Sequence, residues 1–277
     1  MSVPAADDEL APWLRRWALT PDGPAFETKF GSRLAPVLTA AGERAMLKVA
    51  AHPEEVAGGA LMAWWGGLGA ASVLAREDYA ILLERLEGPR RLAALARQGA
   101  DDEATRILCK AAAGLHAPRS ALPPPTLVPL EIWFRALWPA EATHGGAFAT
   151  AAAVARELLD DPRDPVVLHG DLHHDNVLDG GARGWLAIDP KGLLGERAFE
   201  FANLFRNPDA GLALAPGRLG RQAGIVAEAA RVERTRLLRW VLAYAGLGAA
   251  WSLQSGHEAD ATAGLDIARA AEAELAS

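Results

Sequence analysis

Residues 166–178 read VVLHGDLHHDNVL, and after a glycine-rich turn the chain continues as WLAIDPKG at 185–192. Short apolar runs with β-branched residues bracket the polar segment, a pattern typical of a strand, a loop and a following hairpin. The side chains of Asp171, Asn176 and Asp189 are therefore expected at loop or strand ends, where polar groups can converge without entering an apolar layer.

Asp171, Asn176 and Asp189 form a set that suits phosphoryl transfer. That reaction uses one carboxylate to orient and deprotonate a hydroxyl, and an amide and a second carboxylate to hold magnesium on the nucleotide phosphates. Gly-Asp and Asp-Asn are also common turn pairs, so each residue alone is a weak signal. The combined spacing favours a kinase-like site, because Asn176 lies five residues and Asp189 eighteen residues after Asp171.

The pattern His-x-Asp-x-x-x-x-Asn followed by Ile-Asp resembles the catalytic and metal-binding loops of the aminoglycoside phosphotransferase family, a branch of the protein-kinase-like fold. Residues 169–208 look most like its streptomycin 6-kinase and hydroxyurea phosphotransferase subfamily. The resemblance implies an α+β, two-lobed protein-kinase-like fold. Residues 1–87 would form an N-terminal nucleotide-binding lobe, an antiparallel sheet with one helix. Residues 88–277 would form a larger, mostly helical C-terminal lobe for catalysis and acceptor binding.

The resemblance also implies an activity: an ATP-dependent phosphotransferase that moves the γ-phosphate to a hydroxyl of a small molecule, such as streptomycin or another aminoglycoside, or hydroxyurea. Asp171 is then the catalytic carboxylate, and Asn176 and Asp189 are the ligands of Mg²⁺. Where family members often carry Pro-Gly before the asparagine, this chain has His174 and Asp175. We expect this difference to leave metal binding intact and to alter the side of the loop that faces the acceptor.

The histidines of this loop are expected to have supporting roles. His169 is expected to support the loop rather than perform chemistry, and His173 and His174 are expected near the acceptor. Lys191 follows Asp189 where protein kinases have a Phe-Gly pair, so regulation through an activation loop is not expected.

Two other interpretations of these residues stay open. The first is a metallohydrolase, in which a His and Asp cluster binds zinc or a metal pair and activates water. Its candidate ligands are His169, Asp171, His173, His174 and Asp175. Such sites usually draw further histidines from elsewhere, and only His257 follows in the chain.

The second interpretation is a binding protein that keeps the fold without turnover. Its signature would be a missing Asp171, Asn176 or Asp189, and all three are present.

The composition is that of a globular protein with a sizeable core: 277 residues, of which 51% are hydrophobic and 23% charged. With 28 basic and 35 acidic side chains the net charge is -7, which excludes a general footprint for nucleic acid or an anionic membrane and suits a cationic small acceptor. Cys109 is expected as a core thiol in a reducing cytosol. The lack of a secretory pattern and of a run of about 18 apolar residues predicts a cytoplasmic protein.

The first 65 residues predict the elements of the small lobe. Residues 7–18 carry apolar side chains at helical spacing. Residues 26–30, 34–38 and 45–49 are predicted as three short strands of an antiparallel meander. A proline then opens a helix over 53–65, which ends before two glycines.

Lys48 lies in the third of these strands and is the candidate phosphate lysine, since in kinase-like folds a lysine in this strand contacts the nucleotide. Its favoured partner is Glu54, which shares a helix face with Leu61. Glu55, which points about 100 degrees away, is the alternative. Ser32, in the turn before the second strand, is a candidate for a phosphate-covering loop, although a plain hairpin turn is the favoured explanation.

Residues 79–88 form an apolar strand that runs into charged residues and a Gly-Pro pair. In the resembled family this segment links the lobes, and its backbone amide and carbonyl groups bind adenine. Glu84, Arg85 and Leu86 are therefore the candidate hinge residues.

The remaining chain predicts helices, among them 101–116, 147–159, 195–205 and further helices within 219–261. Four arginines between 231 and 239 are expected on a solvated helix face. The acids of this region are the candidates for recognition of the acceptor. They are Glu196, Glu200, Asp209, Glu228, Glu258 and Asp260.

Overall fold

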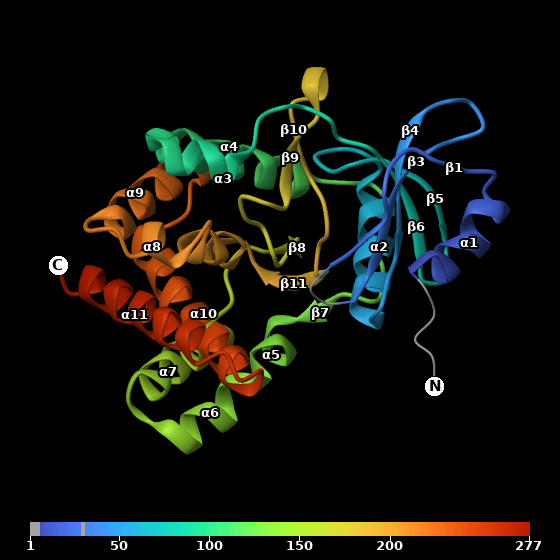
Figure 1. The fold of residues 1–277 in the computed structure, drawn as a ribbon. Helices are drawn as coiled ribbons and strands as arrows, with labels where there is room; N and C mark the ends of the chain where they lie inside the picture. Colours follow the sequence, from blue (N-terminus) through green and yellow to red (C-terminus); the bar gives the residue numbers. More distant parts are fainter. Residues whose placement is uncertain (1–5, 29–30) are drawn as a thin grey trace.

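The computed structural model describes residues 6–28 and 31–277. Figure 1 shows an antiparallel sheet with its helices, built by the first third of the chain, beside a mostly helical region built by the remainder. A group of short strands lies between these two regions. This arrangement confirms the predicted two-part α+β architecture.

The N-terminal sheet has the order β1-β3-β4-β6-β5, with β2 paired to β3 and every neighbouring pair antiparallel. Its strands are β1 (Thr20–Pro21), β2 (Phe26–Glu27), β3 (Arg33–Leu38), β4 (Arg44–Val49), β5 (Val73–Glu77) and β6 (Ala80–Glu84). The predicted meander is confirmed. The strand predicted at 26–30 is shorter than expected, since β2 ends at Glu27, and residues 29–30 lie outside the described residues.

The two faces of this sheet have different neighbours. Helix α1 (Ala6–Arg16) covers one face, where Leu10 and Trp13 join a core with Val37 and Leu47. Because side chains alternate along a strand, Lys48 points from the opposite face of β4. That face is the one next to helix α2 (Pro53–Trp65), which separates the sheet from the rest of the molecule (Figure 1).

Helix α2 begins with a proline at its first turn, as predicted, and ends at Gly66, which adopts the left-handed conformation. Its apolar side chains Leu61 and Trp65 join the main core of the C-terminal region. Two buried glycines lie in its middle. At Gly58 the helix packs so closely on the Pro190 backbone that a Cβ atom there would lie 2.2 Å from the Pro190 carbonyl oxygen. This contact sets the distance between α2 and the segment that follows Asp189.

The strand, loop and hairpin predicted around residue 170 are confirmed. The strands are β7 (Val128–Pro129), β8 (Pro165–Leu168), β9 (Val177–Asp179), β10 (Trp185–Ala187) and β11 (Leu193–Glu196). β9 and β10 pair as an antiparallel hairpin through the short helix η3 (Gly181–Arg183), and β8 pairs with β11, which in turn pairs with β7. The loop 169–176 is therefore held between two strands that belong to different small sheets.

The C-terminal region is mostly helical. Its helices are α3 (Leu92–Leu95), η1 (Ala96–Ala100), α4 (Asp101–Leu115), α5 (Leu130–Trp133), η2 (Phe134–Ala136), α6 (Leu137–His144), α7 (Gly146–Asp160), η4 (Arg197–Arg206), α8 (Ala210–Ala213), α9 (Arg218–Ala230), α10 (Arg234–Gln254) and α11 (Glu258–Leu275). The helix predicted at 195–205 is wrong in its start and type, because β11 extends to Glu196 and η4 is a 3₁₀ helix. Among the described helices, none combines the length and apolar character that crossing a bilayer requires.

Helix α10 is the central helix of this region and is buried over most of its surface. The prediction of a solvated arginine face is wrong for Arg236, whose side chain is 5% exposed and forms an ion pair with Glu196 at 2.6 Å between Nη2 and Oε2. Glu196 is equally buried, so it is not available for recognition of an acceptor. The buried pair instead joins α10 to the end of β11.

The packing of α2 on Pro190 can be tested by adding a methyl group to the helix. We expect Gly58→Ala to lower the free energy of unfolding by about 1–3 kcal/mol, because the new Cβ would clash with backbone that cannot turn aside. Gly59→Ala is the matched control, since its Cβ would meet only side-chain atoms, the tip of Ile81 at 3.3 Å and Cδ of Arg76 at 3.6 Å, and alanine favours the helix. Denaturant unfolding measures both variants; equal stabilities would contradict the proposed contact.

Candidate active site

The loop between β8 and β9 brings the three predicted residues together. The amide nitrogen of Asn176 donates a hydrogen bond to the backbone carbonyl of Asp171 at 2.8 Å. The backbone N–H of Ile188 donates to the carbonyl of Asn176 at 2.9 Å, which places Asp189 next to the end of the loop. Asp189 itself has a positive φ of 58°, so the chain turns sharply at this residue. The sequence spacing thus corresponds to one compact site.

Each oxygen of the Asp171 carboxylate has different neighbours. Oδ1 accepts a hydrogen bond from Nδ2 of Asn203 at 2.8 Å, and Nε2 of His173 lies 3.9 Å away. Oδ2 lies 3.8 Å from Nζ of Lys191, which is longer than a direct hydrogen bond. The side chain is 25% exposed. Asn203 therefore holds one of the two carboxylate oxygens of Asp171 in place.

Asn203 was not predicted from the sequence, and neither was the role of Glu200. The buried carboxylate of Glu200 accepts hydrogen bonds from the backbone N–H groups of His169 at 2.8 Å and Gly170 at 3.0 Å. A third bond links it to Nε2 of His116 at 3.0 Å. Burial opposes its ionisation, but the bonds from His116 and the loop outweigh burial and lower the pKa of Glu200. The prediction that Glu200 recognises the acceptor is wrong, because it lies beneath the loop.

The type of helix explains why Glu200 and Asn203 act together. A 3₁₀ helix has three residues per turn, so side chains three positions apart lie on one face, whereas in an α-helix they would be rotated by about 60 degrees. η4 runs for ten residues, longer than such helices usually do. The sequence shows that Glu200 and Asn203 are three residues apart. This spacing places both side chains on one face only if the helix is a 3₁₀ helix.

His169 supports the loop, as predicted. Its Nε2 lies 2.8 Å from the carbonyl oxygen of Ile188, and its Nδ1 accepts a bond from the backbone N–H of Asp171 at 3.2 Å. The side chain is buried, and burial lowers the pKa of the ring, so it is neutral near pH 7. A ring with both nitrogens engaged in the protein is not free to bind a metal.

His174 departs from its predicted place near the acceptor. It is 1% exposed, and burial lowers its pKa to about 4, so it belongs to the interior. Its neighbour His173 is partly exposed and does lie beside Asp171. Among the described residues, no group of three or more His, Cys, Asp or Glu side chains is arranged to hold a metal ion. The metallohydrolase interpretation is therefore contradicted.

Lys48 connects the sheet, helix α2 and the segment that follows β10. Its Nζ lies 2.8 Å from a carboxylate oxygen of Glu55 and 2.5 Å from Oδ1 of Asp189. Burial opposes the charge of the lysine, but the carboxylates of Asp189 and Glu55 outweigh it and raise the pKa of Lys48. Burial likewise opposes the charge of Asp189, and Lys48 lowers its pKa. The two groups stabilise each other in their charged forms.

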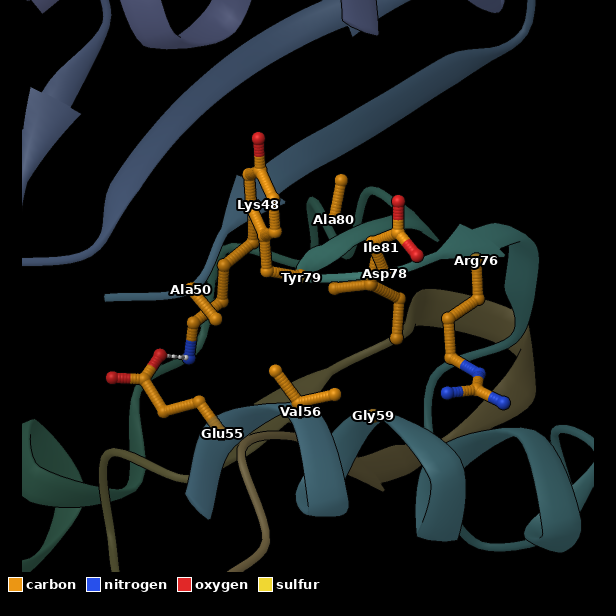
Figure 2. A pocket seen from close by; sticks show the side chains of 10 residues that line it. All are labelled: Lys48, Ala50, Glu55, Val56, Gly59, Arg76, Asp78, Tyr79, Ala80 and Ile81. Atoms are coloured by element: carbon orange, nitrogen blue, oxygen red, sulfur yellow. Dashed lines mark ion pairs between the residues drawn. The ribbon is translucent and has the colours of Figure 1, made fainter. Parts of the chain in front are cut away.

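The expected pairing of Lys48 with Glu54 is wrong, because Glu54 is exposed and Glu55 makes the contact. Figure 2 shows Lys48 and Glu55 facing each other at one end of a small pocket between α2 and the β5–β6 turn. The hydroxyl of Ser32 lies 2.7 Å from both carboxylate oxygens of Glu55 and accepts a bond from the Ala51 N–H at 3.0 Å. Ser32 is fully buried and positions Glu55, so it is not a phosphate-covering residue as predicted.

The hinge segment is fastened by its charged side chains. Glu84 accepts a bond from the backbone N–H of Ser72 at 2.6 Å and pairs with Arg183 of the β9–β10 hairpin. Arg85 pairs with Asp22 at 2.5 Å. These contacts tie the segment to both regions of the molecule. Adenine binding by the backbone from Glu84 to Leu86 stays a prediction.

The other acids proposed for the acceptor have varied surroundings. Asp209 accepts a bond from the Leu212 N–H at 2.9 Å at the start of α8 and pairs with Arg97 at 2.8 Å. Glu228 on α9, and Glu258 and Asp260 on α11, are exposed. Their contribution to acceptor binding stays a prediction.

Comparisons with known proteins agree with this geometry. The family model of aminoglycoside/hydroxyurea antibiotic resistance kinases matches residues 16–256. A streptomycin 3''-kinase of Klebsiella pneumoniae is 51% identical over 261 residues, 92% of this chain and 96% of the relative. A streptomycin 6-kinase of Streptomyces griseus is 32% identical, with 92% and 85% covered. The aminoglycoside phosphotransferase APH(4)-Ia, solved with ADP and hygromycin B, has the same fold, with a TM-score of 0.71, 14% identity, and 98% and 99% coverage.

The roles of the two neighbouring acids of α2 predict different effects of the same substitution. Glu55→Gln should weaken the ion pair that positions Lys48. It should lower kcat for phosphoryl transfer by about tenfold or more, because a displaced Lys48 would lose the phosphate contact predicted for it. Glu54→Gln, the matched control, should behave like the wild type. Steady-state kinetics decides the pairing, and a larger effect at position 54 would contradict it.

Proposed function

The chain belongs to the family of aminoglycoside/hydroxyurea antibiotic resistance kinases, and we propose that it transfers the γ-phosphate of ATP to the 3''-hydroxyl of streptomycin. The observation that carries this proposal is the 51% identity to a streptomycin 3''-kinase along nearly the whole of both chains. The 6-kinase relative is 32% identical, which favours the 3'' position over the 6 position.

Asp171 is the residue to which we assign the role of base. Its Oδ1 is held by Asn203, so Oδ2 is the oxygen that can orient the acceptor hydroxyl and take its proton. A base in this position contributes typically about 100-fold to 10,000-fold to the rate. The neutral His169 and the buried Glu200 fix the loop and leave Asp171 as the group that meets the acceptor.

Asn176 and Asp189 are the residues that would hold Mg²⁺, and their chemistry suits it. Asn176 uses its amide nitrogen to bond the loop, which leaves the amide oxygen as its ligand atom. Asp189 adds a charged carboxylate, and oxygen donors of this kind are the ligands that magnesium prefers. When bound, the metal supplies positive charge to the nucleotide phosphates. The hydrogen bond between Ile188 and Asn176 keeps the two ligands adjacent.

Lys48 is the residue to which we assign the phosphate contact in the nucleotide lobe. Glu55 and Ser32 hold it from the side of α2, and Asp189 holds it from the side of the metal. Adenine would then bind along the hinge backbone from Glu84 to Leu86. The net charge of -7 suits an acceptor that is a small cation, and aminoglycosides carry several positive charges.

An acceptor panel with ATP and magnesium tests this function. The panel should contain streptomycin, hygromycin B and hydroxyurea, and the site of phosphorylation should be mapped by NMR of the product. We expect streptomycin to be preferred and to be phosphorylated at the 3'' position. A product modified at the 6 position, or turnover of hydroxyurea in place of streptomycin, would contradict the proposal.

The catalytic assignment is checked in the same assay with Asp171→Asn. This variant should lower kcat by about 100-fold or more with nucleotide affinity within a fewfold of wild type, because it removes the base and leaves the metal ligands. Unchanged turnover of Asp171→Asn would contradict the assignment of Asp171 as the base. No phosphorylation of any acceptor by the wild type would favour a binding protein that keeps the fold without catalysis.

A further inference from the structure

Lys191 lies beside Asp171, and the mechanism proposed above does not use it. Its Nζ is 3.8 Å from Oδ2 of Asp171, the oxygen that faces the acceptor. Its backbone N–H donates to the carbonyl of His169 at 2.7 Å, so the residue is fastened to the strand that carries the loop. Its side chain is 24% exposed, so Lys191 is only partly buried.

The position of Lys191 differs from that of Lys48. Lys48 is bound closely by two carboxylates, at 2.8 Å from Glu55 and 2.5 Å from Asp189, on the side of the nucleotide lobe. Lys191 comes from the C-terminal region, two residues after Asp189, and its ammonium lies 3.8 Å from the Asp171 carboxylate. The two lysines therefore lie beside different carboxylates, Lys48 beside Asp189 and Lys191 beside Asp171.

Phosphoryl transfer takes place in the space between a base and a metal-bound phosphate. In the transition state the charge spreads over the three equatorial oxygens of the transferring group, and fixed cations stabilise it strongly. Asp171 and Asp189 are themselves negative and would repel those oxygens. A second cation next to Asp171 offsets this repulsion at the place where the new bond forms.

We propose that Lys191 is a catalytic residue that binds an equatorial oxygen of the transferring phosphoryl group. The proposal rests on the phosphotransfer assigned above, but not on the identity of the acceptor. In the step, the acceptor oxygen forms a bond to the γ-phosphorus while the bond from that phosphorus to the bridging oxygen breaks. The electron pair of the broken bond stays on ADP, and the hydroxyl proton passes to Asp171.

The decisive comparison uses Lys191→Met, Lys191→Arg and the control Lys110→Met. Methionine keeps much of the length of lysine without its charge, and Lys110 is exposed on α4. Lys191→Met should lower kcat by about 100-fold to 1,000-fold, the usual effect of losing one transition-state contact. Lys191→Arg should keep turnover within about tenfold of wild type, because the charge remains. Lys110→Met should be unchanged.

Binding measurements separate this role from a general effect on the fold. Calorimetry with magnesium should show that Lys191→Met weakens binding of the β,γ-imido analogue of ATP by about fivefold more than binding of ADP, since only the analogue has a γ-phosphate. The slow hydrolysis of ATP without acceptor should fall in parallel with kcat. This second readout does not depend on streptomycin, so it distinguishes failure of this proposal from a wrong acceptor.

Three results would overturn the proposal. The first is a kcat of Lys191→Met within threefold of wild type, where about 100-fold is expected. The second is an equal loss of affinity for ADP and for the imido analogue, which would show a disturbed nucleotide site. The third is an arginine variant as slow as the methionine variant, which would show that charge is not the property that matters.

Discussion

The buried carboxylate of Glu200 is the interaction on which the site depends. It accepts two backbone N–H groups from the start of the catalytic loop and a third bond from His116. A charge inside the protein is tolerated only when it is fully hydrogen-bonded, so this carboxylate and this loop conformation require each other. The tight 3₁₀ turn of η4 then places Asn203 on the same face, where it holds Asp171. Helix η4 thus holds the loop through two of its side chains, Glu200 and Asn203.

A second constraint joins the two regions of the molecule. Gly58 lets α2 rest on the Pro190 backbone, and this contact brings Glu55 within reach of Lys48, which also pairs with Asp189. The sheet supplies Lys48, the helix supplies Glu55, and the segment after β10 supplies Asp189. Because each charge in this group neutralises another, displacement of one element leaves an unpaired charge in a mostly buried place. Residues 189–191 therefore contact both Lys48 of the sheet and Asp171 of the loop.

The sequence predicted what depends on local pattern and short spacing. The strand, loop and hairpin around Asp171 carry strong alternation and turn signals, so their arrangement followed directly. The partner of Lys48 depends on how α2 is rotated about its axis. The prediction of Glu54 is wrong because the face that Glu54 shares with Leu61 packs on the core, and the sequence does not show which face of α2 is turned towards Lys48. The roles of Glu200 and Asn203 could not be predicted from the sequence, because polar side chains at helical spacing are expected on a surface. The 3₁₀ geometry of η4 and its tertiary packing bury both side chains.

The most direct test of this arrangement is the turnover of Asn203→Ala beside its affinity for magnesium and a nonhydrolysable ATP analogue. Asn203 bonds the catalytic carboxylate and none of the assigned metal ligands. Its loss should lower kcat by about 10- to 100-fold through misplacement of Asp171, with nucleotide affinity and thermal stability close to wild type. A variant with normal kcat would contradict the claim that η4 positions the base. A parallel loss of nucleotide affinity would contradict it as well, because the helix would then be supporting the whole fold.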